Sequence, residues 1–140
     1  MMKQMFKVED RLDIQELVVR YGFLVDDRRW NDMGDVFTPD AVVDFGDFGR
    51  MAGLDNIVSR FRAATHPLQH VIANHLIDRV NDDEAIVFSK ALFPVPGDGV
   101  FEGVYRDVVV RTPDGWRIKY KTINNYGGQY SPWANENYKV

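Results

Sequence analysis

The pattern of apolar residues changes at Pro67, and this change restricts the folds open to the chain. Before Pro67 the apolar residues recur mainly at helical spacing. After it, long segments are rich in Val, Ile, Phe, Tyr and Thr and are separated by Asn-, Asp-, Pro- and Gly-containing turns. These segments are residues 68–80, 84–94, 100–111 and 116–126. Helices at one end of a sequence and strands at the other predict an α+β domain, with helices covering one face of an antiparallel sheet.

The part before Pro67 predicts three helices and a short hairpin. Residues 9–27 carry apolar side chains at helical spacing, and residues 54–64 repeat that pattern. A shorter helix is expected over residues 30–37, because Pro39 would stop it. Residues 41–45 predict a short strand, followed by glycine-containing turns around a second one.

Size and composition indicate one domain that needs no disulfide bond or structural metal to fold. At 140 residues, of which 45% are hydrophobic, residues 1–140 can bury a single core, with 127–140 as a C-terminal tail. No segment predicts a leader or a membrane span, so we expect a soluble protein. Cysteine is absent, which excludes disulfides and zinc–thiolate sites and agrees with the expected cytoplasmic location. The net charge of -4 gives no basic surface for nucleic acid. The three histidines are dispersed, so no metal site is expected.

Two segments could bring a carboxylate to an imidazole. Asp26 ends the first predicted helix, and His70 opens the first long strand. A carboxylate beside an imidazole fixes the tautomer of the ring and stabilises its protonated form, which suits acid–base chemistry. We expect the charge of Asp26 to raise the pKa of His70 more than burial lowers it. Asp26 as a solvated helix end, and His70 as a structural histidine, are the alternative interpretations.

The order of the motifs resembles a known family. They are Ile14-Gln-Glu-Leu with Tyr21, Asp26 and Trp30, then Phe37-Thr-Pro-Asp-Ala, Gln69-His70-Val-Ile-Ala-Asn74 and Asp114-Gly-Trp116-Arg-Ile, which together cover about residues 9–123. In this order they resemble the SnoaL-like branch of the nuclear-transport-factor-two-like superfamily. The resemblance implies a cone-shaped, curved antiparallel sheet with three N-terminal helices on its concave face. The family contains dehydratases, dehydrochlorinases, isomerases and proteins without chemistry, so the fold alone decides no function.

The resemblance is closest to scytalone dehydratase-like and dehydrochlorinase-like enzymes, and it implies site residues. It makes His70 the general base and Asp26 the carboxylate that orients it, and it places the hydroxyl of Tyr21 near a substrate oxygen. The other expected substrate-binding residues are Trp30, Asn74, Phe88, Tyr105 and Lys121. Strand alternation puts Asn74 on the face of His70 and puts His75 on the other face, at the surface or an interface. Close relatives tend to carry Arg where this chain has Lys121, so halide or enolate binding through a guanidinium is not expected.

Two classes of function remain open. The favoured one is a cofactor-independent lyase or isomerase, dehydratase-like, that removes a proton from a small, mostly apolar cyclic or polyketide-like substrate. The alternative is a non-catalytic small-ligand-binding or subunit-assembly domain. Water activation of the epoxide-hydrolase type needs an Asp–Arg–Asp set that the sequence does not supply. A contact between Asp26 and His70 inside an enclosed cavity would favour the enzyme.

The long strands also predict self-association. Val104 and Val108 have one parity and Tyr105 and Val109 the other, so a sheet covered by helices on one face would leave apolar side chains on its outer face. We expect a homodimer or higher homo-oligomer built on that face, and sedimentation equilibrium would detect it.

Overall fold

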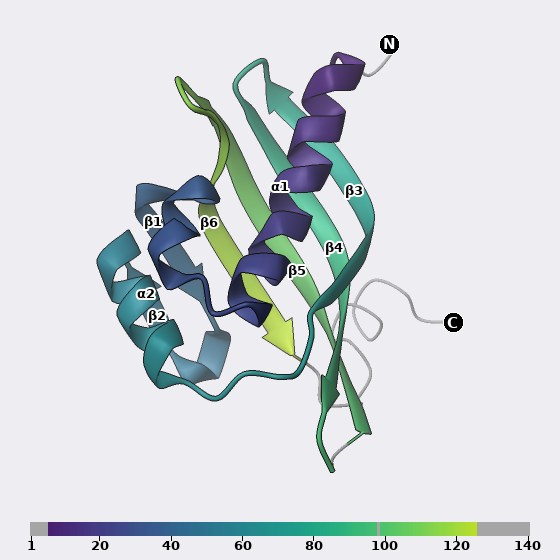
Figure 1. The fold of residues 1–140 in the computed structure, drawn as a ribbon. Helices are drawn as coiled ribbons and strands as arrows, with labels where there is room; N and C mark the ends of the chain where they lie inside the picture. Colours follow the sequence, from purple (N-terminus) through teal and green to yellow (C-terminus); the bar gives the residue numbers. More distant parts are fainter. Residues whose placement is uncertain (1–5, 98, 126–140) are drawn as a thin grey trace.

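The computed structural model describes residues 6–97 and 99–125 (Figure 1). The chain begins with helix α1 (Val8–Asp26), the 3₁₀ turn η1 (Trp30–Asp35) and strand β1 (Phe37–Asp44). The 3₁₀ turn η2 (Gly46–Phe48), strand β2 (Arg50–Ala52) and helix α2 (Leu54–Ala63) follow. The remaining strands are β3 (Val71–Asn81), β4 (Glu84–Val95), β5 (Gly99–Thr112) and β6 (Gly115–Asn125). The expected α+β class is therefore confirmed.

The six strands form one sheet in the order β2-β1-β6-β5-β4-β3. Figure 1 shows α1 lying across one face of the sheet, with α2 beside β1 and β2. The expected antiparallel sheet is corrected in one place, because β1 and β6 run parallel while the other neighbours are antiparallel. After β2 and α2 the chain crosses to the far edge at β3. The meander back to the middle then brings β6 beside β1 in the same direction.

The expected number of helices was wrong. Within the described residues there are two α-helices, and the segment expected to form the second helix is the 3₁₀ turn η1. This turn is short because β1 begins directly after Val36, where Phe37 pairs with Ile118 of β6. With six residues it is longer than most 3₁₀ pieces, which rarely exceed about four residues.

The core lies between α1 and the inner face of the sheet. On α1, Ile14, Val18 and Val25 have no exposed surface, and on β4 the alternating residues Ala85 and Val87 have none either. Burying a side chain of the size of valine or isoleucine contributes roughly 1.5–3 kcal/mol. This packing fixes α1 against the strands and so fixes the height of its last residues above the sheet.

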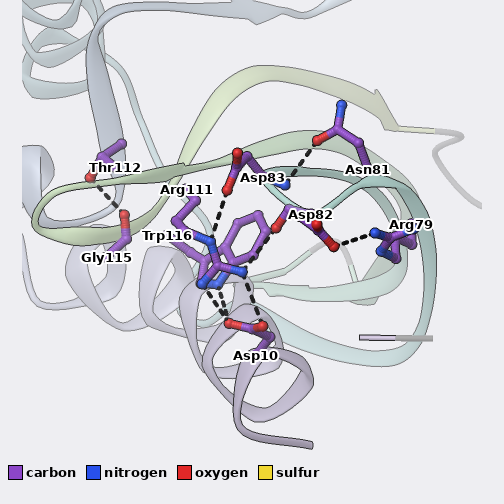
Figure 2. A network of polar contacts seen from close by, with 9 residues as sticks. All are labelled: Asp10, Arg79, Asn81, Asp82, Asp83, Arg111, Thr112, Gly115 and Trp116. Atoms are coloured by element: carbon purple, nitrogen blue, oxygen red, sulfur yellow. Dashed lines mark hydrogen bonds and ion pairs between the residues drawn. The ribbon is translucent and has the colours of Figure 1, made fainter. Parts of the chain in front are cut away.

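A polar network holds the N-terminal end of α1 against two hairpins (Figure 2). The Arg111 guanidinium donates to both carboxylate oxygens of Asp10, at 2.8 and 3.0 Å, and to Oδ1 of Asp83 at 3.1 Å. The indole N–H of Trp116 donates to the same Asp10 at 3.1 Å, and the guanidinium lies 4.6 Å from the centre of the Trp116 ring system. The β3–β4 and β5–β6 turns are thereby tied to the first turn of α1.

The outer face of the sheet carries exposed apolar side chains. Val71 and Leu92 are paired across β3 and β4 and are 46% and 47% exposed. The homo-oligomer stays a prediction, and the predicted tail, residues 127–140, lies outside the described residues. No helix in the described part of the chain is long and apolar enough to cross a membrane.

Candidate active site

Asp26 and His70 meet although they are 44 positions apart in the sequence. Asp26 is the last residue of α1, and His70 directly precedes β3. Nδ1 of His70 lies 2.6 Å from Oδ1 of Asp26, and the backbone N–H of His70 donates to Oδ2 at 3.0 Å. The side chains of His70 and Asp26 are only 6% and 18% exposed. The structure thus brings together the two residues that the sequence singled out.

This contact selects one tautomer of the neutral ring. With its proton on Nδ1, the imidazole donates to the Asp26 carboxylate and leaves the lone pair on Nε2. Because the second carboxylate oxygen accepts from the His70 backbone N–H, Asp26 binds both the ring and the backbone of His70. A fixed ring with a free Nε2 is the arrangement a general base needs.

The expected direction of the His70 pKa was wrong. Burial lowers the pKa of His70 below its ordinary value of 6.5, and this exceeds the rise caused by the hydrogen bond and charge of Asp26. The charges of His66 and Lys121 lower it further. His70 is therefore neutral at pH 7, and its Nε2 can accept a proton.

Gly22 allows α1 to pass close to His70. A Cβ at Gly22 would lie 3.0 Å from Cδ1 of Ile72, 3.2 Å from Cβ of His70 and 3.4 Å from the His70 carbonyl oxygen. The sequence reasoning missed this residue. The available signal was a glycine in the middle of a helical pattern, where glycine costs about 1 kcal/mol relative to alanine.

We expect Gly22→Ala to disturb the Asp26–His70 contact. The helix would gain about 1 kcal/mol from alanine, while crowding against His70 would cost roughly 1–3 kcal/mol, so the net change in the free energy of unfolding should be destabilising and small. NMR titration of His70 should show an altered pKa. Gly34→Ala is the matched control, since its Cβ would meet only Cδ2 of Leu54 at 3.6 Å. An unchanged His70 titration in Gly22→Ala would contradict the proposed role of this glycine.

A cavity of about 580 Å³ opens beside His70. Its wall is mostly apolar and aromatic and is built from α1, η2, β2, α2, the loop before β3, and strands β4, β5 and β6. The lining residues are Tyr21, Phe45, Phe48, Met51, Arg60, Phe61, Ala64, Thr65, His66, Pro67, His70, Phe93, Val95, Phe101, Tyr105 and Ile123. A cavity of this size and character suits a small, largely apolar ligand.

Residues 7–122 match the model of the SnoaL-like domain family. This chain belongs to the SnoaL-like family. The uncharacterized protein Rv2910c of Mycobacterium tuberculosis is 38% identical over 122 residues, which cover 80% of this chain and 82% of that protein.

Two solved structures share the fold of this SnoaL-like protein. A protein of unknown function with a cystatin-like fold from Nostoc punctiforme aligns with a TM-score of 0.78 and 21% identity, covering 87% of this chain and 95% of the other. A protein of Novosphingobium aromaticivorans, provisionally named a scytalone dehydratase, aligns with a TM-score of 0.71 and 21% identity, covering 85% of this chain and 88% of the other. At this identity the likeness concerns the fold.

Three of the expected substrate-binding residues of the SnoaL-like site lie at the cavity or against its wall. Tyr21 and Tyr105 line it, with side chains in edge contact at 5.9 Å between ring centroids. Trp30 is not part of the lining, but its ring packs on His66 at 5.4 Å and on Phe61 at 6.5 Å. Trp30 therefore supports the wall from behind.

Asn74 and Phe88 do not line the cavity, which corrects the sequence expectation. Asn74 is exposed and has a positive φ of 56°, at a shift of register between Ala73 and Leu76. This bulge breaks the alternation from which the position of Asn74 was expected. Phe88 lies between Val87 and Ser89, both buried on the inner face, and so has the parity of the outer face.

The bulge also turns His75 inward, whereas a surface or interface position was expected. Its Nδ1 lies 2.8 Å from Oγ of the buried Ser89, and His75 does not line the cavity. Burial lowers the pKa of His75, against a rise from the charge of Asp107.

Lys121 lies behind the cavity wall, where the sequence had placed it with the substrate-binding residues. Its ammonium donates to both carboxylate oxygens of Asp107, at 3.1 and 3.2 Å, and both side chains are 0% exposed. The sequence reasoning missed Asp107. Its parity, shared with Tyr105 and Val109, was an available signal that it faces inward.

The lining also contains basic residues to which the sequence analysis gave no role. His66 lines the cavity, and its Nε2 lies 2.6 Å from the carbonyl oxygen of Phe61. Arg60 of α2 is exposed at the same cavity. Across residues 6–97 and 99–125, no three His, Asp or Glu side chains gather as a metal site would require.

Proposed function

We propose that this SnoaL-like protein is a cofactor-independent lyase or isomerase of the dehydratase type. It would act by proton abstraction on a small, mostly apolar cyclic or polyketide-like substrate. The observation that carries this proposal is His70, held by both carboxylate oxygens of Asp26 at the wall of an apolar cavity of about 580 Å³. The fold shared with a protein provisionally named a scytalone dehydratase agrees with this class of reaction.

Each site residue has a role in such a reaction. Nε2 of His70 removes a proton from a carbon next to a carbonyl group, and Asp26 stabilises the imidazolium that forms. The Tyr21 hydroxyl donates a hydrogen bond to the carbonyl oxygen, where negative charge develops. Burial raises the pKa of Tyr21, so the hydroxyl keeps its proton and remains a donor.

The second half of the reaction restores the base. In a dehydration, the electron pair left on the substrate expels a neighbouring hydroxyl group, which takes the proton from His70 and leaves as water. In an isomerisation, His70 returns the proton to a different carbon. Both routes end with neutral His70, and neither needs a cofactor to balance atoms or charges.

The pH dependence follows from the lowered His70 pKa. Because only the neutral imidazole accepts a proton, kcat/KM should rise with pH and level off above an apparent pKa that lies below the ordinary value of 6.5. Asp26→Asn removes the carboxylate charge that raises this pKa, so its profile should shift to lower pH. A rate that begins to rise only above pH 6.5 would contradict His70 as the base.

The test is a panel of cyclic ketones with acidic C–H bonds, with and without a hydroxyl group at the β-carbon, incubated in D₂O. Mass spectrometry would detect incorporation of deuterium or loss of water. Wild type should produce one of these changes, and His70→Gln should not. His75→Gln is the matched control, because it removes a histidine that does not line the cavity.

The alternative, a non-catalytic ligand-binding or assembly domain, is supported by the apolar lining alone, since binding needs no base. A ligand that co-purifies with the protein and is released unchanged, together with no turnover across the panel, would favour it.

For partners, we propose a homo-oligomer through the outer face that carries Val71 and Leu92, and no nucleic acid. The absence of cysteine supports a cytoplasmic location.

A further inference from the structure

The Asp107–Lys121 pair has no part in the reaction described so far. The two residues face each other across β5 and β6, and both side chains are 0% exposed. Desolvation raises the pKa of Asp107 and lowers that of Lys121, and their mutual attraction opposes both changes. An apolar pair of similar volume is often at least as stable as a buried ion pair. The stability of the fold alone therefore gives little reason for charges at this position.

Lys121 lies directly behind the aromatic wall of the cavity. Its Nζ is 4.1 Å from the centroid of the Tyr21 ring and 3.9 Å from that of Tyr105. Both rings line the cavity, and Tyr21 also contacts the ring of His70 at 6.1 Å between centroids. A desolvated cation over an aromatic face is attracted strongly, so Lys121 holds both rings in place.

The tyrosine hydroxyls are available to a ligand. Neither hydroxyl is hydrogen-bonded to another residue within 6–97 and 99–125. Neither is fully enclosed, because the one fully enclosed side-chain polar atom without a partner in those ranges is Oγ1 of Thr38. Both hydroxyls can therefore donate to an oxygen atom bound in the cavity.

The charges around the pair have a consistent effect on the site. The titratable groups that interact with it are His75 on β3, Tyr21 on α1, Tyr105 on β5, and His70 before β3. The charge of Asp107 favours protonated tyrosines, and that of Lys121 favours neutral His70. Such a site has hydrogen-bond donors on one side and a free base on the other.

We propose that Asp107 and Lys121 are positioning residues of the cavity. Lys121 holds the rings of Tyr21 and Tyr105. In the free protein its charge also opposes a positive charge on His70. Negative charge on a ligand oxygen at the two hydroxyls offsets that opposition. This inference rests on the proposed function and narrows its substrate class to compounds that form an enolate- or phenolate-like oxygen. A ligand oxygen that carries negative charge would be stabilised by the imidazolium of His70 and the ammonium of Lys121, whereas a substrate without such an oxygen gains nothing from either charge.

The experiment removes both charges and keeps the volume, with Asp107→Leu and Lys121→Met in one protein. NMR titration of His70 in the free protein should move to higher pH. The probe ligand is 4-nitrophenol, whose visible absorption distinguishes the bound phenolate from the phenol. Phenolate affinity should fall by roughly tenfold or more, because the rings of Tyr21 and Tyr105 lose the desolvated ammonium that holds them. Binding of the uncharged analogue 4-nitroanisole should change little.

A matched control removes an ion pair that lies away from the cavity. Glu16→Gln with Arg20→Gln removes an exposed pair on α1, whose atoms lie 2.9 Å apart, and should leave the His70 titration and phenolate affinity unchanged. Lys121→Arg keeps the positive charge and should retain more phenolate affinity than the apolar double variant. If the apolar double variant does not fold, Asp107→Asn with Lys121→Gln keeps a polar contact without charge and carries the same expectations.

The outcomes separate this inference from the proposed function. A folded, uncharged double variant with a wild-type His70 titration and wild-type phenolate affinity would overturn the positioning role, whatever the protein catalyses. Wild-type protein that fails to bind 4-nitrophenolate in preference to 4-nitroanisole would overturn it too. A shifted titration with lost phenolate affinity would support it, even if the ketone panel gives no turnover and the lyase proposal fails.

Discussion

Replacing His70 with alanine is expected to lower kcat/KM by roughly 10²–10⁴-fold, the usual contribution of a positioned general base. The reason is the 2.6 Å contact with Asp26, which leaves Nε2 of His70 as the proton acceptor at the cavity wall. Steady-state turnover of whichever ketone of the panel reacts in D₂O would measure the loss.

His75→Gln serves as the control for this prediction, because His75 lies on β3 but does not line the cavity. It should retain turnover close to that of wild type. Asp26→Asn should be impaired less than His70→Ala, since the base remains while its orientation and charge support are weakened. Turnover by His70→Ala at the wild-type rate would place the chemistry on another residue.

The largest expected loss of stability follows from Lys121→Met alone. This change leaves the Asp107 carboxylate buried without its partner, and breaking a buried pair in this way typically costs about 3–5 kcal/mol in the free energy of unfolding. The loss should shrink as the pH falls. Burial already raises the pKa of Asp107 in wild type, and an unpaired Asp107 in the folded protein would take up a proton more readily than in the unfolded chain.

Urea unfolding measures this prediction against two comparison proteins. The double variant Asp107→Leu with Lys121→Met should regain most of the lost stability, because it leaves no unpaired charge. Arg20→Met removes one partner of an exposed pair, with side chains 48% and 67% exposed, and should change the free energy of unfolding by less than about 1 kcal/mol. A loss from Lys121→Met as small as that from Arg20→Met would contradict the interpretation of the pair as fully desolvated.

The strands after Pro67 were predictable because their Val-, Ile- and Tyr-rich segments are bounded by turn residues. Their observed bounds, Val71–Asn81, Glu84–Val95, Gly99–Thr112 and Gly115–Asn125, differ little from those expected. The parallel pairing of β1 with β6 was not predictable from local patterns, because it joins segments far apart in the chain. The bulge at Asn74 was missed for another reason. It depends on a left-handed backbone conformation at Asn74, where the sequence has no glycine to indicate such a conformation.

The site was predictable only where the sequence motifs carried information. Asp26 and His70 were found through their motifs, and their contact agrees with that prediction. The direction of the His70 pKa was missed because the depth of burial is a property of the packed structure, and here burial outweighs the carboxylate. Asp107 and Gly22 were missed because each acts through a neighbour on another element.

Helix α1 is supported at both of its ends. At the first turn Asp10 is held by Arg111 and Trp116, and at the last residue Asp26 is held by His70. The helix has 19 residues and so spans about 28 Å at 1.5 Å per residue. Ile14, Val18 and Val25 pack on the sheet between these two ends, so α1 is held as one rigid element. Through this element the exposed turns that bind Asp10 help to position the carboxylate of Asp26 beside its imidazole.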